Sequence, residues 1–185
     1  MIFSNVTVPL LGMVDTGVVG HLDSPVYLGA VAVGAMVFSF LYTGLNFLRM
    51  GTTGIAAQAF GADDNRELRA SLGQALIVAF SIALLFLVLQ IPIGELSMRL
   101  VGAGIDVEKE ALNYFNVRIW SAPGTLANMV LIGWFIGLQN ARVPMLMFLT
   151  INIVNILLDL LFVIVLGMKV EGVALASVIA EYSGF

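Results

Sequence analysis

Long runs of apolar residues alternate with short polar turns along the whole chain. A helix needs roughly 20 mostly apolar residues to cross the hydrocarbon core of a bilayer. All the runs except the last are of this order or longer, and the turns between them carry charges, Gly and Pro, as in Gly61–Glu67. The pattern predicts an all-α integral membrane protein, with spans at residues of about 2–20, 27–60, 70–90, 110–139, 143–168 and, truncated, 172–185.

Residues 91–110 depart from this pattern. They mix glycines with an acidic cluster that ends at Glu110, and Pro92 is expected to end the third run. We interpret this stretch as an interfacial connection between two spans. Because the other connections are short, neighbouring helices should pack antiparallel. The last run is too short to cross a membrane, so we expect the chain to be a piece of a longer protein.

Prolines lie inside two of the later runs. Pro123, followed by Gly124, falls within the fourth run and should kink that helix, because proline removes a backbone hydrogen bond. Pro144 lies near the start of the fifth run, where its missing N–H does little harm.

The composition narrows the class of protein. Of 185 residues, 60% are hydrophobic and 11% are charged, which is too few charges to cover a water-facing surface. The net charge of −4, with only 8 Lys and Arg, argues against a nucleic-acid partner. The absence of cysteine excludes disulfides, thiol catalysis and Cys-based metal sites within these residues.

Two carboxylates interrupt the apolar runs. Asp15 lies in the first run and Asp159 in the fifth, and a charge near the middle of a span costs about 2.5–3.5 kcal/mol. Asn155 is four residues before Asp159 and Asn152 is seven before it, so the three share one face of a helix. A carboxylate with amide neighbours can alternate between protonated and ionised forms, or bind a small cation such as Na+ through oxygen.

The alternative for these polar side chains is a purely structural role. Asn152 and Asn155 could form only interhelical hydrogen bonds, and Asn128 and Gln74 are expected to be packing contacts rather than ligands. Asn128 and Asn152 could also line a cavity. The segment Asp15–Gly17 spells the D-T-G of aspartic proteases, but only one copy exists and it lies in an apolar run. With no other enzyme motif and no cofactor motif present, we expect a protein that is not an enzyme and needs no cofactor.

Several segments resemble the multidrug and toxic compound extrusion (MATE) family, specifically its DinF-like branch. The resemblance covers nearly the whole chain in order. It is carried by VPLLGMVDTGVVGHL (8–22), FLRMGTTGIAAQA (47–59), RIWSAP (118–123), GWFIGLQN (133–140), Asn152–Asp159 and GVALAS (172–177).

The resemblance implies a six-helix amino-terminal lobe of a two-lobe, twelve-helix antiporter, with the carboxy-terminal lobe missing. It implies export of small cationic or amphipathic compounds across the cytoplasmic (inner) membrane in exchange for H+ or Na+. By position, Asp15, Asn155 and Asp159 would form the coupling site, with Ser177 where the sixth helix of the family often has Thr.

Two other functions stay open at this stage. A flippase for lipid-linked precursors shares the helix arrangement, but such carriers tend to line their cavity with basic residues, whereas these spans offer acids and amides. A membrane scaffold without transport activity would leave the two aspartates without a role.

Overall fold

The computed structural model describes residues 17, 20 and 24–185, and all its regular elements in that part of the chain are helical. Most of the expected first span, including Asp15, lies outside the described residues. The helices are α2 (Pro25–Gly44), α3 (Phe47–Gly61), α4 (Asn65–Val88), α5 (Gln90–Val101), α6 (Ile105–Arg118), α7 (Ala122–Gly137), α8 (Arg142–Asp159) and α9 (Val170–Tyr182).

Local sequence explains where several helices begin. Ser24 caps α2 by accepting a hydrogen bond from the Val26 backbone N–H at 3.3 Å, and Pro25 occupies the first turn. Asp64 caps α4 by accepting from the N–H groups of Arg66 and Glu67 at 3.0 and 2.9 Å. Both caps lie in the polar turns between the apolar runs.

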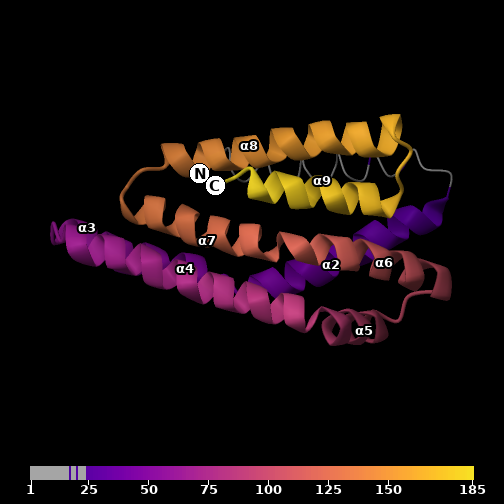
Figure 1. Ribbon diagram of the computed structural model, residues 1–185, viewed down its shortest axis with the longest axis horizontal. Coiled ribbons are helices and arrows are strands. Elements are labelled where there is room, and N and C mark those ends of the chain that lie inside the picture. Colours follow the sequence, from indigo (N-terminus) through magenta and orange to yellow (C-terminus); the bar gives the residue numbers. More distant parts are fainter. Residues whose placement is uncertain (1–16, 18–19, 21–23) are drawn as a thin grey trace.

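The helices form an elongated bundle organised around α6 and α7. These two helices follow one another almost end to end (Figure 1). The 3-10 turn Ile119–Ser121 joins them, and Pro123, where a kink is expected, lies in the first turn of α7. On one side of α7 lie α3 and α4, and on the other side α9 lies between α8 and the α6–α7 pair (Figure 1). The α6–α7 segment is therefore the centre of the lobe.

Four helical segments are long and apolar enough to cross a membrane, by length and composition, among the described residues: Pro25–Gly61, Asn65–Val88, Ile105–Gly137 and Arg142–Val165. In the central one, 61% of the apolar window is buried, against 17% in the segments containing α4 and α8. Large side chains such as Phe40 and Leu100 are 82% and 78% exposed. An apolar exterior of this kind suits a hydrocarbon solvent.

The apolar core has two parts. One is built around the stacked rings of Phe38 and Phe115, 5.2 Å apart, and joins α2, α5, α6 and α9. The other joins α3, α4 and α7 through Leu48, Leu126 and Val130.

Three features differ from the sequence-based expectations. Residues 91–110 include most of the helix α5 rather than only a connection. Pro92 lies in the first turn of α5, where backbone N–H groups have no partner within the helix, so the missing N–H of proline costs little. The run at 27–60 is divided by a turn at Leu45–Asn46. The fifth run changes from an α-helix to the π-helix Leu160–Val165 directly after Asp159.

Candidate functional site

The polar face predicted for the fifth run is turned into the protein. Asn155 is 1% exposed and Asp159 is 0% exposed, so both are enclosed by neighbouring helices rather than by lipid. Asn152, one turn before Asn155, is partly buried. A carboxylate enclosed in this way is sensitive to any change in local charge, because little solvent screens it.

Ser177, on α9, meets this face. Its side chain is 6% exposed, and its Oγ accepts a hydrogen bond of 3.4 Å from Nδ2 of Asn155. The antiparallel packing of α8 on α9 brings these two residues together although 22 positions separate them. Asn155, Asp159 and Ser177 thus lie on adjoining helices, and the fourth predicted member, Asp15, lies outside the described residues.

The backbone changes its hydrogen-bonding register immediately after Asp159. In the π-helical segment Leu160–Val165 each N–H reaches one residue further back, as in the bond from Leu166 N–H to the Leu161 carbonyl at 2.9 Å. Such segments are rare and often occur at functional sites. The sequence contains no Pro or Gly in this segment that would have indicated it.

A second polar cluster lies between α6, α7 and α9, and the sequence analysis did not single it out. Arg118 at the end of α6 faces Glu181 of α9, with 4.0 Å between Nη2 and Oε1, and the two side chains are only 16% and 18% exposed. Asn128 of α7 donates to Oε2 of the same carboxylate at 3.1 Å. These residues join three helices through one carboxylate.

Asn128 was expected to be a packing contact or a cavity-lining residue. Its amide donates both to the Glu181 side chain and, at 2.8 Å, to the Glu181 backbone carbonyl, so it acts as an interhelical hydrogen-bond donor. Gln74, also expected to be a packing contact, is exposed on α4. The signal for Glu181 was present: it follows Ser177 by four residues and so extends a polar face on the last helix.

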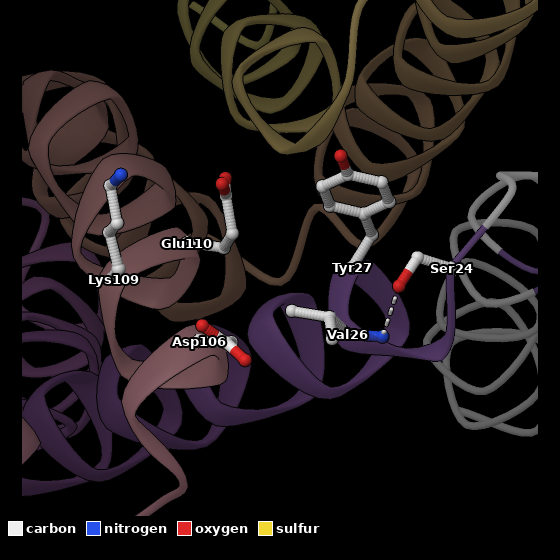
Figure 2. A pocket seen from close by; sticks show the side chains of 6 residues that line it. All are labelled: Ser24, Val26, Tyr27, Asp106, Lys109 and Glu110. Carbon is white, nitrogen blue, oxygen red and sulfur yellow. Dashed lines mark hydrogen bonds between the residues drawn. The ribbon is translucent and has the colours of Figure 1, made fainter.

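A shallow pocket of about 240 Å³ opens elsewhere, between the starts of α2 and α6. Figure 2 shows Tyr27, Asp106, Lys109 and Glu110 around it, beside the cap that Ser24 forms on Val26. Nearby, the Lys169 ammonium lies 5.1 Å from the centre of the Tyr27 ring, and interaction with Tyr27 raises the pKa of Lys169. None of the predicted site residues lines this pocket.

No group of three or more His, Cys, Asp or Glu residues in the described part of the chain is arranged to hold a metal ion. The Na+ site predicted from the sequence comprises Asp15 together with Asn155 and Asp159, and Asp15 lies outside the described residues. The described oxygen atoms therefore represent only part of the predicted coupling site.

The fold defines a class of protein: an all-helical membrane protein with polar side chains enclosed among its helices. The family model MatE matches residues 1–161, and the chain belongs to this family of multidrug and toxic compound extrusion transporters. The chain is 52% identical over 183 residues to DNA damage-inducible protein F of Escherichia coli (strain K12), a match that covers 99% of this chain and 40% of that protein.

Two further comparisons agree. The chain is 27% identical over 154 residues to the probable multidrug resistance protein NorM of Bacillus subtilis (strain 168), covering 83% of this chain and 34% of that protein. It superimposes on the outward-facing conformation of a multidrug resistance MATE family transporter with a TM-score of 0.90 and 25% identity, covering all of this chain and 41% of that one. The chain thus spans about two fifths of the length of the E. coli relative and of the solved transporter, as the single-lobe fold class predicts.

Proposed function

We propose that this chain is the cation-coupling half of a secondary antiporter that exports small amphipathic or cationic compounds across the cytoplasmic membrane. The observation that carries the proposal is the burial of Asp159 beside Asn155, in a helix apolar enough to cross a membrane. Membership of a family whose relatives include probable multidrug resistance proteins supports the kind of substrate.

The chemistry follows from the position of the carboxylate. Ionised Asp159 in a low-dielectric site attracts either H+ or Na+, and binding of either cation removes the cost of the buried charge. We propose that Asp15 joins Asp159 in this step and that neutralisation of both permits the conformational change that releases the substrate. Coupling then requires only that cation and substrate favour different conformations.

The carboxylates can be tested in vesicles that contain the natural full-length polypeptide. We expect Asp159→Asn and Asp15→Asn to lower gradient-driven efflux of a fluorescent organic cation more than about tenfold, since neither amide can bind and release a proton. The control is Asp63→Asn, the same change at an exposed turn residue, which should leave efflux unchanged. Wild-type efflux in both site variants would contradict the proposal, and separate H+ and Na+ gradients identify the coupling ion.

The flippase alternative is less favoured by the charges. A pyrophosphate group needs unpaired basic residues, and Arg118, the basic residue in the buried polar cluster, faces Glu181. Preferential binding of a polyprenyl pyrophosphate over organic cations would reverse this ranking.

A further inference from the structure

The ion pair between Arg118 and Glu181 is enclosed but incompletely satisfied. Its shortest separation of 4.0 Å is longer than a direct hydrogen bond. The other terminal nitrogen of Arg118, Nη1, is buried and makes no hydrogen bond to any residue that the structure describes. Glu181 is the carboxylate within ion-pair distance of Arg118 among those residues, so loss of either partner would leave a charge in a poorly solvated site.

The last turn of α9 is also seated directly on α7. Asn128 holds both the side chain and the carbonyl of Glu181. At Gly124, an added Cβ would lie 3.3 Å from the carbonyl carbon and oxygen of Glu181, which is tighter than ordinary van der Waals contact. The position of Glu181 is therefore fixed from α6 by charge and from α7 by hydrogen bonds and close backbone packing.

Ser177 lies one helical turn before Glu181 on the same face of α9, about 6 Å along the axis. A helix transmits a shift of one turn to the next nearly as a rigid body. The Asn155–Ser177 hydrogen bond, at 3.4 Å, is already at the long end of the range for such bonds. A displacement of a few tenths of an ångström at Glu181 is thus enough to make or break it.

We propose that Arg118 and Glu181, with Asn128, are positioning residues for the candidate coupling site: they fix where α9 lies against α6 and α7, and so set the distance from Ser177 to Asn155. This inference rests on the proposed antiport function for its significance, but the predicted effect on the distance from Ser177 to Asn155 can be tested without a transport measurement. A buried ion pair can be recognised from its variants, because removal of one charged partner disrupts the local packing far more than removal of both.

The experiment measures cross-linking in membranes that contain the full-length polypeptide, in a background without other cysteines. Residues 1–185 contain none. One cysteine pair, Asn155→Cys with Ser177→Cys, reports on the candidate site. A second pair, Phe162→Cys with Gly172→Cys, reports on the opposite end of α9, where an added Cβ at Gly172 would lie 3.3 Å from Cβ of Phe162. The added Cβ would also lie 2.7 Å from Cβ of Met168, which must shift, so each rate is compared with that of the same cysteine pair in the otherwise unchanged carrier. Both pairs are treated with the same short bifunctional thiol reagent.

Each pair is combined with Glu181→Gln, with Arg118→Gln, with both changes together, and with Glu171→Gln as the matched control on the first turn of α9. We expect either single change to slow cross-linking of the 155–177 pair at least about threefold and to leave the 162–172 pair unaffected. The double change should restore the rate, and Glu171→Gln should not alter it.

Three outcomes would overturn the inference. Unchanged rates in both single variants would mean that the ion pair does not position Ser177. Equal slowing of both cysteine pairs would indicate general loosening of the lobe. Failure of the 155–177 pair to cross-link in the parent background would mean that the contact itself does not exist.

A transport measurement separates this inference from the proposed function. In the same carrier without added cysteines, Glu181→Gln should raise the cation concentration for half-maximal efflux severalfold, and the double variant should return toward the wild-type value. If the aspartate variants retain efflux while the cross-linking result holds, the antiport mechanism fails and the positioning role stands.

Discussion

Individual polar side chains carry the candidate chemistry of this lobe, and each lies where a helix packs on another helix. Asn155 and Ser177 are the clearest case, since the amide of one donates to the hydroxyl of the other across α8 and α9. A buried donor that loses its acceptor costs about 1–3 kcal/mol. We therefore expect loss of the Ser177 hydroxyl to affect the candidate site strongly, although the group is small.

Ser177→Ala should raise the cation concentration needed for half-maximal efflux by roughly five- to a hundredfold, because a cost of about 1–3 kcal/mol is converted at a factor of ten in affinity for every 1.4 kcal/mol. Ser177→Thr keeps the hydroxyl and should remain near the wild-type value. The measurement is efflux from vesicles against cation concentration.

Ser183→Ala is the matched control, since the Ser183 hydroxyl donates a hydrogen bond to the Ala180 carbonyl of its own helix end. An equal effect of the alanine change at both serines would argue against a specific role for Ser177.

Helix pairs in this lobe depend on close backbone approach. The contact between α3 and α7 is the most extensive in the described part of the chain, and it passes over Gly133 and Gly137, which are spaced by four residues as in many membrane helix pairs. An added Cβ at Gly133 would lie 2.5 Å from the Arg49 carbonyl oxygen. No side chain fits there without separating the two helices.

Gly133→Ala should lower the stability of the folded lobe by about 1–3 kcal/mol, the usual cost of overpacking. The effect should appear as a lower midpoint in thermal unfolding of the purified full-length carrier in detergent. Gly51→Ala, on α3 where an added Cβ meets nothing within 4 Å, is the control and should leave the midpoint unchanged. A stable Gly133→Ala variant would show that α3 and α7 can separate without cost.

The cap of α4 allows a second test of what stabilises an individual helix. Asp64→Ala removes the acceptor of two backbone N–H groups and should cost about 0.5–2 kcal/mol. Asp64→Asn retains an acceptor oxygen and should cost much less. Thermal unfolding of the two variants in detergent distinguishes them, and equal midpoints would rule out a contribution from the cap.

The part of the chain that the structure describes has an apolar exterior and a largely apolar core that encloses a few polar side chains, as expected for a helical membrane protein. Because the chain spans only about two fifths of the E. coli relative and the solved transporter, we expect the proposed transport cycle to involve parts outside these residues. Alternating access in repeat-built carriers requires one half to move against the other.

Residues 1–185 expressed by themselves should therefore remain in the membrane fraction after an alkaline wash but should show no gradient-driven efflux. The matched control is the full-length polypeptide in the same vesicles, which should transport. Efflux by the isolated segment at a comparable rate would mean that this lobe can pair with a second copy of itself.

The amino-acid sequence by itself determined the class of protein, because the length and polarity of each run decide whether a helix prefers lipid or water. It also indicated the face of α8 that carries Asn155 and Asp159, since helical periodicity is a local property. It did not indicate the turn at Leu45–Asn46, where Gly44 and Asn46 are only a weak turn signal within a long apolar run. The π-helical segment after Asp159 has no distinctive residue pattern. Only the tertiary structure decided that Arg118, Asn128 and Glu181 meet, because that contact depends on how α6, α7 and α9 pack and not on their spacing along the chain.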